Sequence, residues 1–232
     1  RNLMLKEFSN VFKRKIGKLN GFCHKIILKR DAIPKIYKAR NIPMVVRDEV
    51  KIELDRLMEA GIIERIESSE WVSPLVVARK ANGKVRLCVD LRNLNRNIQV
   101  DQFPLPRIDE TLSMTRDSTY SSTLDLSSAY HQIPLHPRSK SLTAFITPFG
   151  CYQFLRMPFG LASAAAVFQR LMYEFFGNKQ GIICFQDDIL IMGKDRVEHD
   201  KRLRGVLEIL QEKGLTRSEE QRLNSSHSDR SR

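Results

Sequence analysis

The sequence predicts a mixed α+β fold, because helix and strand patterns occur together without a regular strand–helix–strand alternation. Apolar periodicity and helix-end signals predict three helices, over residues 47–61, 160–176 and 195–214. Two further segments, 73–95 and 181–193, each hold two β-rich runs joined by a short turn, which predicts two hairpins. The predicted fold class is therefore α+β.

Composition limits the class of protein. The chain has 232 residues, of which 42% are hydrophobic and 28% charged, as in ordinary soluble domains. No run approaches the roughly 20 apolar residues of a membrane span, and no secretion leader is visible. The four cysteines form no CxxC pair, which disfavours a zinc knuckle. We therefore expect reduced thiols, an intracellular protein in the cytoplasm or nucleus, and no membrane partner.

Positive charge is concentrated near the start of the sequence. Net charge is +12, and residues 13–40 contain ten Lys and Arg against one acid, Asp31. Such a block predicts contact with a polyanion, most commonly nucleic acid. A solvated basic face is the alternative.

The first half of the chain predicts an extended segment, a helix and a hairpin. Residues 1–46 are basic and interrupted by Pro34 and Pro43, and we expect an extended arm. Gly61 is a natural end for the helix over 47–61. The apolar positions of this helix, at i, i+4, i+7 and i+8, are Val50, Leu54, Leu57 and Met58. In the first hairpin, Asn82-Gly83 tolerates the positive φ of a tight turn.

The second half predicts a strand that ends near Asp125, followed by a helical turn. The helix over 160–176 is expected to bury a stripe made of Phe168, Leu171, Met172 and Phe175. In the last helix, Asp195 and Glu198 have capping-box spacing, and Gly214 ends it. Residues 217–232 are polar and aperiodic, so we expect disorder there, with a non-native extension as the alternative.

Two adjacent carboxylates interrupt the apolar run “CFQDDILIMG”. Asp is common in hairpin turns, so Asp187 and Asp188 alone favour a structural interpretation. Asp125 also follows a dry strand, and three carboxylates would meet if the hairpin paired beside that strand. Such a cluster would shift its protonation or hold a divalent cation. Oxygen-only ligands favour Mg²⁺ or Mn²⁺, and two such ions about 4 Å apart serve phosphoryl transfer.

Five motifs follow one another along the chain: “WVSPLVVARKANGKVRLCVDLRNLN”, “FPLPRIDETL”, “TLDLSSAYHQIPL”, “TAFITPFGCYQFLRMPFGL” and “CFQDDILI”. Together, in this order and spacing, they resemble the reverse transcriptase of gypsy-type LTR retrotransposons, over residues 11–216. The resemblance implies a right-hand polymerase with fingers and a ferredoxin-like palm, and a sequence that stops before the thumb. The implied division is an arm (1–46), fingers (47–104 and 133–163), palm (105–132 and 164–216) and polar tail (217–232).

The resemblance also implies an activity. The family adds dNTPs to a primer 3′-hydroxyl on an RNA or DNA template, as one part of a polyprotein. Protease, RNase H and integrase domains are expected in the parent element, which assembles in cytoplasmic virus-like particles. Asp125, Asp187 and Asp188 match the catalytic carboxylates, and the Leu126 carbonyl would join them around two Mg²⁺ (or Mn²⁺).

Other positions match the nucleotide and template contacts of the family. The matched nucleotide-binding residues are Lys80, Arg86, Ser128, Ala129, Tyr130, Phe159, Gly160 and Gln186. Arg86 suits the triphosphate because its planar guanidinium can fork two oxygens, whereas Lys80 could be a plain surface charge. The N–H groups of Ser128 and Ala129 would lie at the start of a helix, which is a favourable site for an anion.

Tyr130 matches the aromatic gate that excludes a 2′-hydroxyl, and a core tyrosine is the alternative. By themselves, Phe159 and Gly160 indicate a turn before a helix. The matched template or primer contacts are Arg92 and Phe185.

The sequence departs from the family pattern at two places. Phe185 and Gln186 stand where a Tyr and a small apolar residue precede the Asp pair, and Gln186 puts an amide where primer and nucleotide meet. Ser163 and Ala165 replace Asn and Pro before a helix. We expect weakened or altered polymerase activity. The rival hypothesis is a non-catalytic nucleic-acid-binding remnant, and a third is an RNA-making palm polymerase.

Overall fold

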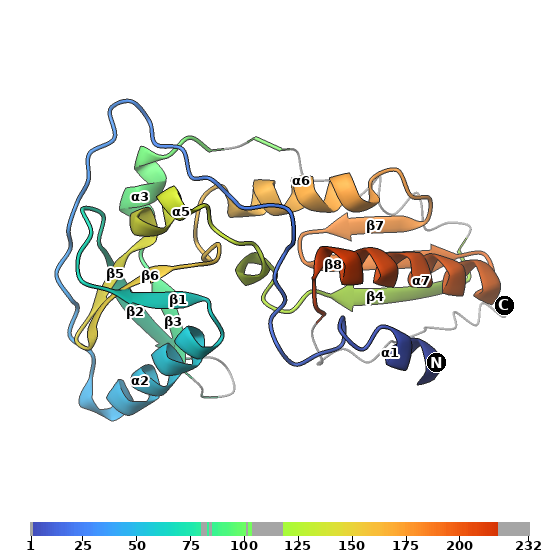
Figure 1. Ribbon diagram of the computed structural model, residues 1–232, viewed down its shortest axis with the longest axis horizontal. Helices are drawn as coiled ribbons and strands as arrows, with labels where there is room; N and C mark the ends of the chain where they lie inside the picture. The colour runs from blue at the N-terminus through green and yellow to red at the C-terminus, as the bar shows by residue number, and fades with distance from the viewer. Residues whose placement is uncertain (1, 80–82, 84, 101, 104–117, 218–232) are drawn as a thin grey trace, which may run out of the picture. The chain divides into compact units, whose positions relative to one another are not determined.

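The chain folds into two compact units (Figure 1). This computed structural model describes residues 2–79, 83, 85–100, 102–103 and 118–217. Unit 1 comprises 1–21, 102–132 and 165–232, and unit 2 comprises 22–101 and 133–164. Each unit has its own sheet, so the predicted α+β class is confirmed.

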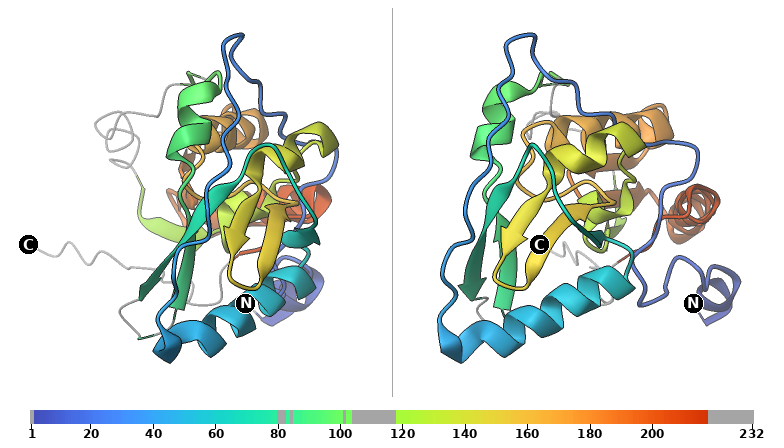
Figure 2. Two further views of the ribbon diagram at one scale, coloured as in Figure 1. Left: turned by 90° about the vertical axis from the view of Figure 1, so that its left-hand side faces the viewer. Right: turned by 60° about the vertical axis from the view of Figure 1, so that its left-hand side comes forward.

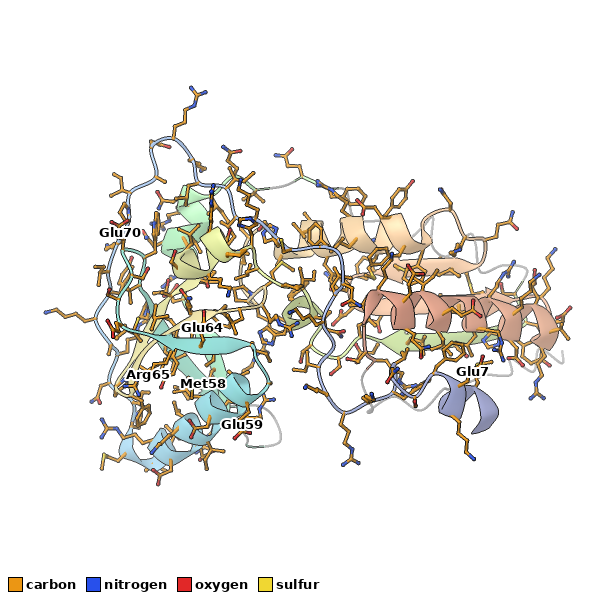
Figure 3. The ribbon with its side chains drawn as sticks, in the orientation of Figure 1. Glu7, Met58, Glu59, Glu64, Arg65 and Glu70 are labelled. Carbon is orange, nitrogen blue, oxygen red and sulfur yellow. The ribbon has the colours of Figure 1, made fainter. Side chains whose placement is uncertain are left out.

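Unit 2 is built on a five-stranded sheet with the strand order β1-β6-β5-β2-β3. The strands are β1 (Ile63–Ile66), β2 (Ser73–Arg79), β3 (Val85–Val89), β5 (Phe145–Thr147) and β6 (Gly150–Phe154). Neighbouring strands are antiparallel except β2 and β5. Across β1 and β6, Gln153 donates a hydrogen bond of 2.7 Å to Glu64, which Figure 3 labels.

The first predicted hairpin is confirmed as β2 and β3, which pair antiparallel from Leu75–Val89 to Arg79–Val85. Gly83 in the connection has a φ of 79°, a left-handed conformation that glycine adopts without steric cost.

The first predicted helix is α2 (Met44–Glu59), which contacts both β1 and β3 and so crosses the sheet (Figure 2). Val50, Leu54 and Leu57 are buried as predicted. The helix begins three residues earlier than predicted. Met44 and Val45 are 77% and 84% exposed, so apolar periodicity could not mark the first turn. The other helical elements of unit 2 are α3 (Arg92–Asn97), α5 (Pro137–Lys140) and η2 (Ser141–Thr143).

Unit 1 holds a three-stranded antiparallel sheet with the order β4-β8-β7. The strands are β4 (Tyr120–Asp125), β7 (Ile182–Phe185) and β8 (Asp188–Gly193), which confirms the predicted strand and the second hairpin. Among the residues of unit 1 that the structure describes, the helical elements are α1 (Asn2–Glu7), η1 (Ala129–Gln132), α6 (Ala164–Phe176) and α7 (Arg196–Lys213). Helix α7 packs against β8 and β4 (Figure 1).

The two long helices of unit 1 differ from prediction only in detail. Helix α6 begins at Ala164 rather than at residue 160, because Gly160 has a φ of 83° and belongs to a turn. In its stripe, Phe175 is only half-buried and Phe176 is buried in its place. The predicted ends of α7 are confirmed: the Asp195 side chain accepts the Glu198 N–H, and Gly214 is a left-handed C-cap.

The segment predicted to be an extended arm, residues 1–46, divides between the two units and leads into α2. Phe8 and Val11 are buried in unit 1, whereas residues 22–43 run as a long extended trace along unit 2 (Figure 2). Arg217, expected to open the polar tail, is buried, and its N–H donates to the Val11 carbonyl. The rest of the expected tail lies outside the described residues.

No described helix has the length and apolarity required to cross a bilayer. The four cysteines are all free thiols. Burial raises the pKa of Cys184 to about 12, so this thiol is unreactive at neutral pH.

Candidate active site

Two aspartates face each other at one end of the unit 1 sheet. Asp125 is the last residue of β4, Asp188 is the first of β8, and the two are direct cross-strand partners. Opposed residues of an antiparallel pair point to the same face, with Cβ atoms about 5 Å apart. Asp187 lies in the adjoining turn, and its carbonyl accepts a 3.0 Å hydrogen bond from the Leu126 N–H. The predicted pairing of this hairpin with the strand that ends at Asp125 is confirmed at the level of the backbone.

The electrostatics of this sheet end suit a cation. Asp187 and Asp188 are exposed, and Asp125 is half-buried. Partial burial, followed by the negative charge of Asp187, raises the pKa of Asp188. A cation would relieve this repulsion, and oxygen donors fit Mg²⁺ or Mn²⁺. Within the described residues, however, no three His, Cys, Asp or Glu side chains already stand in the geometry of a metal centre.

The turn between β7 and β8 consists of Gln186 and Asp187. Gln186 has a φ of 52°, an uncommon conformation for a residue with a side chain. Its N–H donates to Oε1 of Gln169, at 3.1 Å, and Nε2 of the same amide donates to the Cys184 carbonyl, at 2.9 Å. Gln186 is exposed, as is the preceding Phe185 at 37%, so both predicted contact residues can reach a ligand.

A second turn follows Asp125, and a buried amide holds it as well. Ser128 has a φ of 48°, and the expected helix after it is one 3₁₀ turn that begins at buried Ala129. Gln132 is fully buried, and its Nε2 donates to the carbonyls of Ser127 (2.8 Å) and Thr216 (2.7 Å). Its Oε1 accepts the Thr216 N–H at 2.7 Å.

Neither Gln132 nor Gln169 was predicted from the sequence to belong to the site. One local signal exists: Gln169 lies three and seven residues before the buried Met172 and Phe176, so it shares their helix face.

Tyr130 lies between the core and the carboxylates. Its ring meets Phe168 of α6 edge-on, with centroids 5.8 Å apart, and the residue is half-buried. Burial, followed by the negative charge of Asp187, raises the pKa of its hydroxyl. The side chain therefore packs like a core tyrosine, and its hydroxyl also lies within electrostatic range of Asp187.

The remaining predicted contacts belong to unit 2. Arg86, exposed on β3, lies over the Phe159 ring, 5.9 Å from its centroid, and Phe159 is 38% exposed. The Gly160 carbonyl accepts a 2.8 Å hydrogen bond from Asn95. The contact of the guanidinium with the ring makes Arg86 and Phe159 one cluster, and Asn95 bonds to the residue that follows Phe159. Lys80 lies outside the described residues.

Arg92, the predicted template contact, is engaged by its own unit. Its Nε and a terminal nitrogen donate to the two carboxylate oxygens of Asp90, at 2.8 and 2.7 Å. Asp90 also accepts from Arg40. The Arg92 side chain remains 79% exposed, so an edge of the guanidinium is open to solvent.

A serine, a histidine and an aspartate also form a hydrogen-bonded line in unit 1. His199 Nε2 lies 3.0 Å from Ser122 Oγ, and Nδ1 lies 3.0 Å from Asp200. Ser122 is only 3% exposed and His199 only 6%. A buried hydroxyl cannot attack a substrate, so this line fastens α7 to β4 and is not a hydrolytic triad.

A strand pair that ends in carboxylates, on a sheet that packs against a helix, is an arrangement in which oxygen ligands for a divalent cation can gather. The chain matches the family described as “Reverse transcriptase (RNA-dependent DNA polymerase)” over residues 78–221, and it belongs to this family. The family expected from the five motifs is therefore confirmed.

Its relatives include polyproteins of mobile elements. The chain is 34% identical over 223 residues to the retrovirus-related Pol polyprotein of transposon opus, and 33% over 198 residues to that of transposon gypsy, both from Drosophila melanogaster. These matches cover 92% and 82% of this chain but only 22% and 19% of the relatives, so the chain spans about a fifth of their length.

Solved structures share the fold. The foamy viral protease-reverse transcriptase in complex with an RNA/DNA hybrid has a TM-score of 0.85 and 23% sequence identity. The match covers 93% of this chain and 29% of the other. This likeness supports the fingers-and-palm architecture.

Proposed function

We propose that this chain is the fingers-and-palm part of an RNA-directed DNA polymerase that extends a primer with dNTPs on an RNA or DNA template. The observation that carries the proposal is the direct pairing of Asp125 with Asp188, with Asp187 in the adjoining turn. This arrangement gathers carboxylates from two strands at the end of a sheet, as metal-dependent phosphoryl transfer requires.

In this proposal Asp125, Asp187 and Asp188, with the Leu126 carbonyl, hold two Mg²⁺ or Mn²⁺ ions. When bound, such ions would activate the primer 3′-hydroxyl and stabilise the charge that develops on the phosphate. The three carboxylates would hold the ions at the end of the sheet. Tyr130 fills the space that a 2′-hydroxyl needs, which favours deoxynucleotides.

The triphosphate contacts are proposed for several groups. Arg86 suits two phosphate oxygens, because the residue is exposed and its planar guanidinium lies over the Phe159 ring. Lys80 and the N–H groups of Ser128 and Ala129 add to the same role. Gly160 and Gln186 are proposed to contact the nucleotide. Phe185 and Arg92 are proposed to contact primer and template.

Primer extension tests this proposal. Purified protein with Mg²⁺ or Mn²⁺ is expected to extend a labelled primer on an RNA template with dNTPs. Asp187→Asn is expected to lower extension by at least about 1,000-fold, because one carboxylate charge is lost from the metal ligands. Asp48→Asn, a matched change on the exposed face of α2, is the control. Equal metal-dependent extension by wild type and Asp187→Asn would overturn the proposal.

The rival is a nucleic-acid-binding remnant without turnover. The exposed cations of residues 25–40 favour it, because they give a basic surface independent of the carboxylates. It predicts binding that is unaffected by a chelator and falls steeply with salt. Fluorescence anisotropy of a primer–template with EDTA, across a salt series, measures this. Binding that does not change with salt would remove the rival, and metal-dependent extension would show that binding is not the whole function.

A further inference from the structure

Gln169 reaches the backbone of the carboxylate-bearing turn with both ends of its amide. The residue lies on α6 and is 2% exposed. Its Nε2 donates to the Cys184 carbonyl and its Oε1 accepts from the Gln186 N–H. The two bonds hold the backbone on either side of Phe185, the last residue of β7. No part of Gln169 needs to touch the substrate for this contact to act.

The turn that Gln169 grips is held in an unfavourable backbone conformation. Two-residue hairpin turns prefer Gly, Asn or Asp where φ is positive, and here Gln186 occupies such a position with a φ of 52°. Among the described residues, only Gln186 and Ser128 are non-glycine residues with positive φ, and both flank the aspartates. A turn with such a residue keeps its shape when surrounding contacts fix it.

The position of this turn sets the spacing of the carboxylates. The Asp187 carbonyl accepts a hydrogen bond from the Leu126 N–H and Asp188 pairs with Asp125, so the backbone held at Gln186 is the direct neighbour of the residues that set this register. Misplacing a reacting group by about 1 Å costs about 100-fold in rate.

We propose that Gln169 is a positioning residue that holds the Asp187–Asp188 turn in register with Asp125 through the backbone at Cys184 and Gln186. This inference rests on the proposed polymerase function for its catalytic consequence, but not for its structural one. An amide suits the position because it offers a donor and an acceptor side by side. An ionised carboxylate has no donor for the Cys184 carbonyl, whereas a protonated carboxyl has both groups.

Hydrogen exchange tests the structural consequence without any activity. In Gln169→Leu, the amide of Gln186 is expected to exchange at least about tenfold faster than in wild type, while β4 and β8 keep their protection. Gln211→Leu, a matched change at an exposed site of α7, is the control. Unchanged exchange at Gln186 would overturn the proposal, and so would equal loss of protection throughout unit 1, since Gln169 would then be an ordinary core residue.

Kinetics test the catalytic consequence. Gln169→Leu is expected to lower kcat by about 10- to 100-fold. The Kd for primer–template, measured in the presence of EDTA, is expected to change by less than about twofold. Gln169→Glu is expected to regain activity relative to wild type as pH falls, because the protonated acid restores both bonds. Gln186→Gly is expected to reduce the penalty of Gln169→Leu, since glycine adopts the positive φ freely.

The two failures are distinguishable. If wild type shows no extension but the Gln186 amide loses its protection in Gln169→Leu, the proposed polymerase function fails, and the structural role of Gln169 in holding the turn stands. If wild type is active and Gln169→Leu matches it in kcat, at every pH, the positioning role is wrong.

Discussion

Gln132 offers the sharpest test of how the turn after Asp125 is held. Its buried amide makes three hydrogen bonds, all to the backbone of Ser127 and Thr216. Gln132→Leu keeps the approximate volume and removes all three. At about 1 kcal/mol for each bond, the free energy of unfolding is expected to fall by about 3 kcal/mol.

Urea unfolding measures this loss. With a slope of about 2 kcal/mol per molar urea, the midpoint followed by far-UV circular dichroism is expected to fall by about 1.5 M. The exposed Gln211→Leu should stay within about 0.5 kcal/mol of wild type. A midpoint of Gln132→Leu that equals the control would refute the reasoning, because the backbone groups of Ser127 and Thr216 cannot lose their hydrogen-bond partner without cost.

Two further predictions concern stability in each unit. A Cβ on Gly193 would lie 2.5 Å from the His199 backbone nitrogen, so Gly193→Ala is expected to lose about 1–3 kcal/mol. Gly205→Ala lies inside α7, where a Cβ meets nothing within 4 Å, and is expected to raise the free energy of unfolding by about 0.5–1 kcal/mol. Urea midpoints check both variants, and a change of the same sign in the two midpoints would contradict the packing argument. Hydrogen bonds and charge from Arg92 lower the pKa of Asp90 to about 2. The resulting stabilisation is present above the unfolded pKa near 4 and is lost as pH falls from about 4 to about 2. Asp90→Asn is expected to lose about 1 kcal/mol at pH 7, after allowance for solvent screening, and to show no such decline in urea titrations between pH 5 and pH 2.

The sequence predicted those parts of the fold that depend on local pattern. Asp195 and Gly214 mark the ends of α7 because capping is decided by residues three or four positions away. Asp125 and Asp188 were expected to meet because each stands at the end of an apolar strand, where a carboxylate is uncommon unless it serves a shared site. The observed register, with Asp125 opposite Asp188, confirms this.

Contacts between distant segments were not predictable in the same way. Gly17 donates to Thr216 across 199 positions of sequence, and no periodicity in either segment marks that bond. The buried Gln132 and Gln169 look like surface residues by composition, because only the packed environment shows where their amides find partners. Met44 and Val45 show the converse, as apolar residues that the fold leaves exposed.

The interleaved layout of the two units has a consequence for biosynthesis. Unit 2 is complete in sequence at residue 164, so its sheet can form during translation once that segment has left the ribosome. Unit 1 closes only when residues 214–217 return to bond with Val11, Gly17 and Lys18 at the other extreme of the chain. These contacts therefore form late, after nearly the whole described polypeptide has been synthesised, and a nascent chain arrested earlier can hold a finished unit 2 and an unfinished unit 1.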